Sequence, residues 1–283
     1  MNKILFCSCL LFTSSFVSAS NLDEVMTLIE QRISGRIGVS IFDTQSKQSW
    51  DRNGNERFPM MSTFKTLACA KMLQDLDSGH LDMNTETEVK ADKLLAWSPV
   101  TQKLVGSTIT VQKACEATML TSDNTAANIV LQHVGGPQGV TDFLRSVGDN
   151  VTRLDRTEPE LNQANPGDLR DTTTPNAMVK TLNNLLLGGV MTEVSKTQLK
   201  FWMQQNKVSD TLLRSVLPKG WFIADRSGAG GYGSRGITAI IWNTKRAPLI
   251  ISIYLTETEL SMAERDSVIA EIGEEILNKY AVK

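Results

Sequence analysis

Strand-like patterns occur at both ends of this chain, and the long helical region between them constrains the fold more than any other feature. Residues 36–43 alternate apolar and other side chains, the turn DTQSKQ follows, and Trp50 lies in a second short strand. After Pro218 the strand patterns return in the segments WFIADRSG, RGITAIIWN and PLIISIYLT. We therefore expect one five-stranded antiparallel sheet assembled from both ends of the chain, with the helices of the middle region inserted as a lobe.

Two terminal helices are expected to cover this sheet. Residues 21–34 carry apolar side chains at helical spacing, and a final helix opens at Ser261 with Glu264 three residues on, which is a capping box. The middle region predicts helices over about 62–78, 111–121, 125–134 and 174–188. The expected fold class is α/β, an α+β sandwich forming a single domain over 20–283, with an α/β lobe at about 20–60 and 207–283 and a helical lobe at about 61–206.

The segment from about Arg153 to Thr173 shows no periodicity and is rich in charge, Pro, Asn and Gly. A structureless stretch of this length within a compact domain is usually functional or disordered.

The N-terminus is typical of a secretory signal. One lysine precedes an apolar stretch over residues 4–12, and Val17 and Ala19 occupy the small-residue positions of a cleavage site. The alternatives are a buried strand or a membrane anchor, but the stretch is too short to span a bilayer. We expect residues 1–19 to be removed on export to the periplasm, and we expect no membrane anchor.

Export also bears on the cysteines, because removal of residues 1–19 leaves only Cys69 and Cys115. In an oxidising compartment two cysteines favour one disulfide, and two separate buried thiols are the alternative. Cys69 lies seven residues after Ser62, and Cys115 lies seven residues before Ser122. If the two helices are bridged and antiparallel, both serines lie about 10 Å from the bridge in the same direction and meet, whereas parallel helices separate them by about 20 Å.

Composition excludes several classes of function. The chain has 29 Lys+Arg against 31 Asp+Glu and no basic block, so we expect no nucleic-acid partner. Its histidines, His80 and His133, are far apart in sequence and leave little from which to build a metal site. We expect no metal and no cofactor, and any hydrolytic chemistry must work without a histidine triad.

Three short motifs can carry chemistry. Ser62 and Lys65 stand at i and i+3 on one helix face, where a lysine could take the serine proton, although one such match is expected by chance. The second motif is Ser122-Asp123-Asn124, which alone is typical of helix capping. The third is Arg226-Ser227-Gly228, which alone is typical of a strand entering a glycine turn.

Together and in this order, these motifs resemble the S-x-x-K, S-D-N and K-T-G set of class A β-lactamases and penicillin-binding proteins. The segment from Glu158 to Asn162 resembles the class A E-x-x-x-N motif, and the likeness extends over about residues 20–283. The resemblance implies a β-lactamase that opens the β-lactam amide of penicillins through a serine acyl-enzyme and a glutamate-activated water, conferring β-lactam resistance.

The resemblance also implies a role for each residue. Ser62 would be the nucleophile, Lys65 would help to activate it, Ser122 would protonate the departing nitrogen, and Glu158 with Asn162 would activate the hydrolytic water. Whether Lys65 or Glu158 through water is the acylation base stays open. The remaining roles are an oxyanion hole from the backbone N–H groups of Ser62 and Ala229, and substrate contacts from Asn124, Arg226, Ser227, Gly228 and Arg235.

One departure from the wider pattern points to a branch of this family. Arginine stands at position 226 where K-[ST]-G has lysine, which resembles the carbenicillin-hydrolysing enzymes. Arginine keeps the charge and suits a carboxylate, but it puts a proton-transfer role for this position in doubt. Arg156 and Asp171 match the ion pair that closes the omega loop of the family, and Glu158-Pro159 matches a cis peptide bond. Trp97 is expected either to form a wall of the cleft or to pack a loop.

Two other functions remain as alternatives: a penicillin-binding D,D-peptidase, and a β-lactam sensor that keeps its acyl group. The pair Glu158 and Asn162, together with the missing membrane anchor, argues against both. We expect a small β-lactam substrate as the partner and a monomeric protein.

Overall fold

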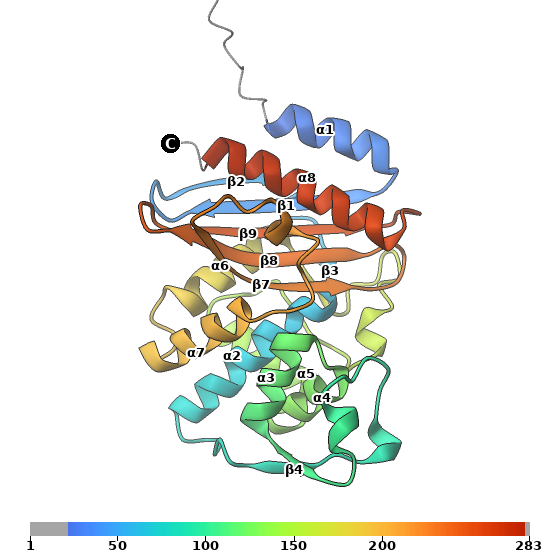
Figure 1. Ribbon diagram of the computed structural model, residues 1–283, viewed down its shortest axis with the longest axis vertical. Helices are drawn as coiled ribbons and strands as arrows, with labels where there is room; N and C mark the ends of the chain where they lie inside the picture. The colour runs from blue at the N-terminus through green and yellow to red at the C-terminus, as the bar shows by residue number, and fades with distance from the viewer. Residues whose placement is uncertain (1–21, 281–283) are drawn as a thin grey trace, which may run out of the picture.

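A computed structural model describes residues 22–280 and contains the expected sheet of five strands (Figure 1). The strand order is β2-β1-β9-β8-β7, and each neighbouring pair is antiparallel. The strands are β1 (Arg36–Asp43), β2 (Gln48–Arg52), β7 (Trp221–Ala229), β8 (Arg235–Asn243) and β9 (Leu249–Thr256). The sheet therefore joins the two ends of the chain, as the sequence predicts. The predicted signal segment, residues 1–19, lies outside the described residues.

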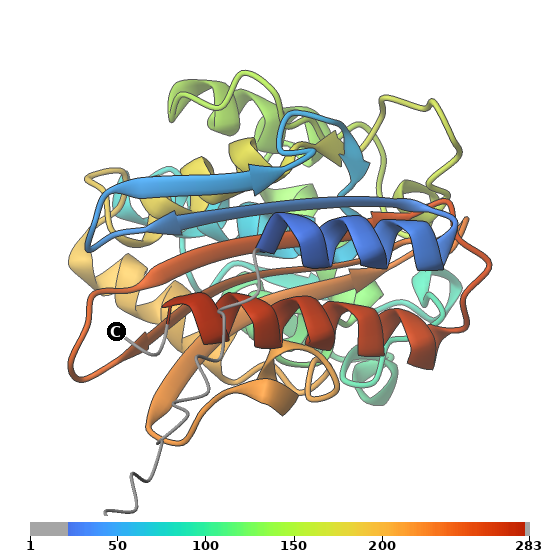
Figure 2. The ribbon, with the colours of Figure 1, turned by 90° about the horizontal axis from the view of Figure 1, so that it is seen from above.

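The two terminal helices, α1 (Leu22–Ile33) and α8 (Met262–Tyr280), lie side by side on one face of the sheet (Figure 2). The apolar faces of the two helices pack against alternate side chains of the central strands, such as Ile37 and Ile251, in one buried cluster. The capping box is present, since the Ser261 N–H donates to Glu264 Oε2 at 2.8 Å.

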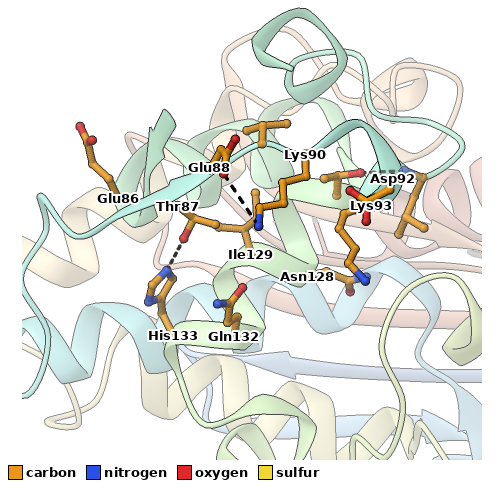
Figure 3. A pocket seen from close by; sticks show the side chains of 13 residues that line it. Glu86, Thr87, Glu88, Lys90, Asp92, Lys93, Asn128, Ile129, Gln132 and His133 are labelled. Carbon is orange, nitrogen blue, oxygen red and sulfur yellow. Dashed lines mark hydrogen bonds and ion pairs between the residues drawn. The ribbon is translucent and has the colours of Figure 1, made fainter. Parts of the chain in front are cut away.

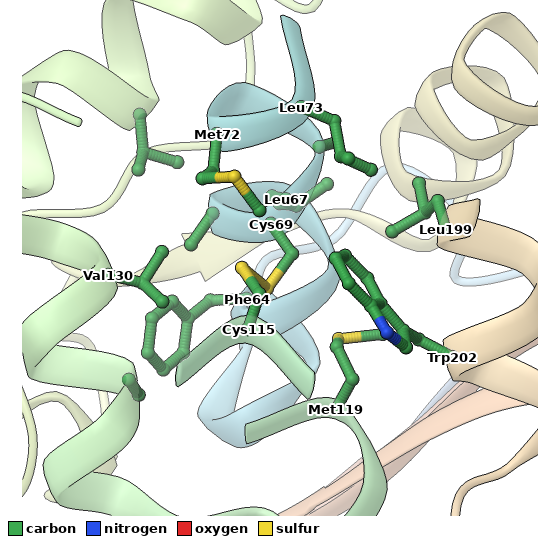
Figure 4. Packing of buried hydrophobic residues seen from close by; sticks show 14 of the residues in the cluster. Phe64, Leu67, Cys69, Met72, Leu73, Cys115, Met119, Val130, Leu199 and Trp202 are labelled. Atoms are coloured by element: carbon green, nitrogen blue, oxygen red, sulfur yellow. A yellow bond between two sulfur atoms is a disulfide. The ribbon is translucent and has the colours of Figure 1, made fainter. Parts of the chain in front are cut away.

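The opposite face of the sheet packs against the helical lobe. Buried apolar side chains fill the space between the helices of this lobe, and Figure 4 shows part of this core. Its α-helices are α2 (Phe64–Asp77), α3 (Val111–Thr121), α4 (Asn124–His133), α5 (Gly136–Ser146), α6 (Pro175–Leu186) and α7 (Glu193–Gln204). The short 3-10 turns are η1 (Met61–Thr63), η2 (Ala91–Lys93), η3 (Thr101–Leu104), η4 (Glu160–Asn162) and η5 (Leu213–Val216). Because both faces of the sheet are covered at its centre, every residue of β9 (LIISIYLT) is buried and the strand reads as a nearly continuous apolar run.

The helical lobe differs from the sequence prediction in two respects. The α-helix predicted from Ser62 begins at Phe64, and Ser62 lies in the preceding turn η1. The helices predicted from the sequence include neither α5 nor α7. Helix α5 begins within the Gly-Gly-Pro stretch that ends α4, because proline is tolerated in a first helical turn and not only after a helix end.

The segment over 153–173 is ordered rather than random. Its end pairs with the chain before Ser62, through β3 (Phe58–Pro59) and β6 (Thr172–Thr173). A further pair of short strands, β4 (Glu86–Glu88) and β5 (Thr108–Thr110), closes the far side of the helical lobe. Among residues 22–280, no helix is long and apolar enough to cross a membrane.

Candidate active site

A disulfide between α2 and α3 brings the two predicted serines together. Cys69 and Cys115 are bonded, with their Cα atoms 5.7 Å apart (Figure 4). Ser122 Oγ donates to Ser62 Oγ at 3.2 Å. Serines seven residues from each cysteine can meet only if the helices run antiparallel, so the structure decides between the two orientations that the sequence left open.

The turn that carries Ser122 is held rigidly from inside. Ser122 ends α3 in the left-handed conformation, with φ of 63°. The neighbouring Asp123 is fully buried, and its carboxylate accepts the backbone N–H groups of Val100, Thr101 and Ala126 at 2.8–2.9 Å. This carboxylate therefore fixes the turn against the loop that follows η2.

Lys65 lies beneath the two serines with no exposed surface. Its Nζ donates to Ser122 O at 2.9 Å, to Ser122 Oγ at 3.1 Å and to Asn124 Oδ1 at 2.7 Å, and it lies 3.0 Å from Glu158 Oε1. Burial lowers the pKa of Lys65 to about 8, against the opposing effect of the Glu158 carboxylate. Four oxygen acceptors surround this nitrogen, so the ammonium form has a partner for each of its protons.

Glu158 and Asn162 lie on the other side of Lys65, in the turn at η4. Asn162 Nδ2 donates to Glu158 Oε2 at 2.5 Å. Within the described part of the chain, Glu158 Oε1 and Asn162 Oδ1 are buried and receive no well-aligned hydrogen bond. Two neighbouring acceptors of this kind suit a small donor such as water.

The backbone of Glu158 is clamped by Asn128 of α4. Asn128 Nδ2 donates to Glu158 O at 2.8 Å, and Asn128 Oδ1 accepts Glu158 N–H at 2.9 Å. The peptide bond between Glu158 and Pro159 is cis, as in the family pattern. Further along the segment, Arg156 Nε meets Asp171 Oδ2 at 2.5 Å, so these two residues close the segment that carries Glu158.

Strand β7 forms the facing wall. A Cβ placed on Gly228 would lie 2.7 Å from the Ser62 backbone nitrogen, so only glycine lets the strand approach Ser62 this closely. Ala229 follows at the end of the strand, and Ser227 Oγ donates to Val208 O at 3.2 Å.

Two arginines give this wall its charge. Arg226 is completely buried, and its guanidinium donates to three neutral oxygens: Ser62 O, Met119 O and Asn206 Oδ1. Burial lowers the pKa of Arg226 to about 10. Arg235 on β8 is anchored by Asp266 of α8, with Nε 2.6 Å from Oδ1.

These groups line one cleft of about 490 Å³. Its lining includes ten of the residues singled out from the sequence: Ser62, Trp97, Ser122, Asn124, Asn162, Arg226, Ser227, Gly228, Ala229 and Arg235. Lys65 and Glu158 have no exposed side-chain surface and lie directly behind this lining. Trp97 is 63% exposed and also donates to Thr121 O at 2.9 Å, so it both lines the cleft and packs its loop.

The profile of the β-lactamase enzyme family matches residues 20–280, which is nearly the whole chain. The chain belongs to this family. It is 54% identical to β-lactamase CARB-3 and 53% identical to β-lactamase PSE-4, both of Pseudomonas aeruginosa, with 99% of this chain and 98% of each relative covered.

Solved structures of this family share the fold. The chromosome-encoded β-lactamase of Vibrio parahaemolyticus superposes with a TM-score of 0.92 at 59% identity, over 93% of this chain and 100% of that chain. An ancestral class A β-lactamase gives a TM-score of 0.90 at 46% identity, over 92% and 100% of the two chains. The resemblance read from the motifs to carbenicillin-hydrolysing class A β-lactamases is confirmed.

The structure adds residues that the motifs did not indicate. Asn128, which clamps Glu158, lies one helical turn after Asn124 and could have been found from that spacing. Val208 and Met262 also line the cleft, but no local pattern marks them. A second cavity, of about 610 Å³, lies between β4 and α4, and α4 lines it with Asn128, Gln132 and His133 (Figure 3). His133 Nε2 lies 2.6 Å from Thr87 Oγ1, and this hydrogen bond joins α4 to β4.

Proposed function

We propose that this chain hydrolyses the β-lactam amide of penicillins, carbenicillin included, by forming and then hydrolysing an acyl-enzyme on Ser62. The observation that carries this proposal is the convergence of Ser62, Lys65, Ser122 and Glu158 at the floor of one cleft. A nucleophile, a buried cation, a second hydroxyl and a carboxylate in contact are what a serine hydrolase needs when it has no histidine.

In acylation, Ser62 Oγ attacks the β-lactam carbonyl carbon and the C–N bond of the ring breaks. Ser122, whose hydroxyl lies 3.2 Å from Ser62 Oγ, gives a proton to the departing nitrogen and regains one through Lys65, 3.1 Å away. We assign Glu158, acting through water, as the base that takes the Ser62 proton. This assignment is supported by the four acceptors around Lys65 Nζ, which favour its protonated form.

In deacylation, Glu158 and Asn162 would hold and activate the water that attacks the acyl carbon. Their oxygens Oε1 and Oδ1 are buried acceptors on side chains that already bond to each other. A general base within hydrogen-bond reach of water contributes about 10²- to 10⁴-fold to such a step. This water distinguishes a β-lactamase from a D,D-peptidase, which releases the drug very slowly, and from a sensor, which keeps the acyl group.

The facing wall would bind the charged parts of the substrate. The backbone N–H groups of Ser62 and Ala229 would form the oxyanion hole, and the close approach at Gly228 supports this geometry. Arg226, Ser227 and Arg235 would bind the β-lactam carboxylate, since all three line the cleft.

The substrate's side chain would lie against Asn124 and Trp97. Asn124 Oδ1 accepts from Lys65 and its Nδ2 donates to Ala96 O at 3.0 Å, so it would contact an amide substituent while keeping its place in the site. The exposed indole of Trp97 offers an apolar wall beside it.

The direct test is steady-state hydrolysis of carbenicillin, benzylpenicillin and a bulky cephalosporin, with clavulanate as inhibitor. We expect repeated turnover of both penicillins. A single stoichiometric acylation without turnover would instead identify a peptidase or sensor.

We further propose that the protein acts in the periplasm as a monomer after loss of residues 1–19. Support for export comes from the signal-like sequence and the disulfide between Cys69 and Cys115. N-terminal sequencing of the protein from a periplasmic fraction, with its mass by light scattering, tests both points. A protein that retains residues 1–19 or scatters as a dimer would contradict them.

A further inference from the structure

A buried chain of polar groups continues from Arg226 away from the cleft. Asn206 Oδ1 accepts from Arg226 Nη1 at 3.1 Å, and Asn206 Nδ2 donates to Asp225 Oδ2 at 2.9 Å. Asp225 Oδ1 in turn accepts from Arg214 Nε at 2.7 Å and forms an ion pair with the same guanidinium. The order is therefore arginine, amide, carboxylate, arginine.

The buried carboxylate of Asp225 forms an ion pair with Arg214 and not with Arg226. Asp225 and Arg226 are neighbours on β7, yet Asp225 pairs with Arg214. Among residues 22–280, no carboxylate lies within ion-pair distance of Arg226, and its acceptors are two backbone carbonyls and the Asn206 amide. Among the described residues, Arg226 thus has no direct carboxylate partner at the wall of the cleft.

The amide at position 206 has a chemistry that neither neighbour could replace. It presents an acceptor to a guanidinium and a donor to a carboxylate at the same time, which neither an arginine nor an ionised carboxylate can do. The backbone fixes this orientation as well, because Asn206 Oδ1 also accepts Val208 N–H at 3.2 Å. Asn206 is 4% exposed, so water does not compete for these bonds.

We propose that Asn206 is a positioning residue that holds Arg226 against the cleft without neutralising it, and so sets the affinity for the carboxylate of the substrate. This inference rests on the proposed function, in which Arg226 binds the β-lactam carboxylate. The other charged groups that act on Arg226 are Asp225 beside it on β7, Arg235 on β8 and Glu158 in the segment across the cleft.

The test compares two changes at this chain of groups. Asn206→Asp places a carboxylate beside Arg226. It also replaces the amide NH₂ group that donates to Asp225 by a carboxylate oxygen, which cannot donate. The double change Asn206→Asp with Asp225→Asn keeps the total charge and keeps one amide donor between the two side chains, but it moves the negative charge from the Arg214 side to the Arg226 side. The double variant thus separates hydrogen bonding from charge.

We expect the double variant to raise KM for carbenicillin about 10-fold, because a charge-assisted contact to the substrate is weakened, while kcat stays within about 3-fold of the original. Asn206→Asp alone should raise KM at least as much and also lower the melting temperature. The matched control is Asn243→Asp, which adds the same charge to β8 at a side chain that only accepts the N–H groups of Lys245 and Arg246.

The outcomes separate this inference from the proposed function. If the unaltered enzyme does not hydrolyse carbenicillin, the proposed function fails. If the unaltered enzyme hydrolyses it and the double variant has an unchanged KM, Asn206 is only a structural link and the inference is wrong. A fall in kcat with no change in KM would overturn it equally. Should Asn206→Asp alone fail to fold, the double variant still decides.

Discussion

The two walls of the cleft, one formed by the helical lobe and the other by β7, each contain a buried cation, but the partners of the two cations differ. On the helical wall, Lys65 lies 3.0 Å from the carboxylate of Glu158. On the β7 wall, Arg226 is equally buried but meets only carbonyl and amide oxygens. Burial of a charge is costly unless it is paired, so the unpaired arginine points to a role in which an external anion becomes its partner. We therefore propose that the helical wall carries out proton transfer and that the β7 wall recognises the anion.

Loss of the nucleophile on the helical wall should have the largest effect. Ser62→Ala removes the hydroxyl that we propose forms the acyl-enzyme, and we expect hydrolysis of a chromogenic β-lactam to fall by about 10⁴-fold or more. The assay is the initial rate at saturating substrate, with folding checked by circular dichroism. Activity close to that of the unaltered enzyme would refute Ser62 as the nucleophile.

A change on the β7 wall should act on binding instead. Arg226→Gln removes the charge, and we expect KM for carbenicillin to rise by about 10- to 100-fold with a smaller change in kcat. Arg226→Lys is the matched control, since it keeps the charge but loses the planar guanidinium group. Its KM for carbenicillin should lie between the values of the unaltered enzyme and of Arg226→Gln. If Arg226→Gln lowered kcat and left KM unchanged, the division of labour between the walls would be wrong.

The charge state of Lys65 should set the alkaline limit of activity. Its pKa is lowered to about 8 by burial, so it is protonated below that pH and loses its proton above it. Since we assign the protonated form to the active enzyme, kcat/KM should fall about tenfold per pH unit above pH 8. A profile that instead declines below pH 8 would identify neutral Lys65 as the acylation base. The measurement is kcat/KM for benzylpenicillin from pH 5 to 10.

Removal of the disulfide should have the smallest effect on catalysis. Cys69→Ala with Cys115→Ala opens a link of 46 residues, which in the chain-entropy model stabilises by about 4 kcal/mol. We expect a melting temperature lower by roughly 10 °C and an unchanged kcat at 25 °C, because apolar side chains of α2 and α3 also pack in one core and hold the two helices together. A large loss of kcat in a folded double variant would show that the bridge itself sets the serine geometry.

The sequence predicts the β-sheet better than the helical lobe, and the reason is physical. The hairpins and terminal helices have clear periods, whereas α5 starts at a Gly-Gly-Pro stretch that equally marks a helix end. The motif residues Ser62, Ser122 and Arg226 could be named in advance because their spacing matches a family. The partner Asn206 acts through a contact with Arg226, 20 residues away in sequence, which no local pattern encodes.

The most direct test of the whole account is the mass of the intact Glu158→Ala protein after mixing with carbenicillin. We assign Glu158 to both steps, so the variant should acylate more slowly than the unaltered enzyme. Once formed, the acyl group should not be released, so one covalent carbenicillin should accumulate on Ser62 and persist for minutes or longer, while the unaltered enzyme shows no lasting adduct. Glu160→Ala, on the same short turn, is the control and should turn over normally. Rapid hydrolysis by Glu158→Ala with no adduct would contradict the account.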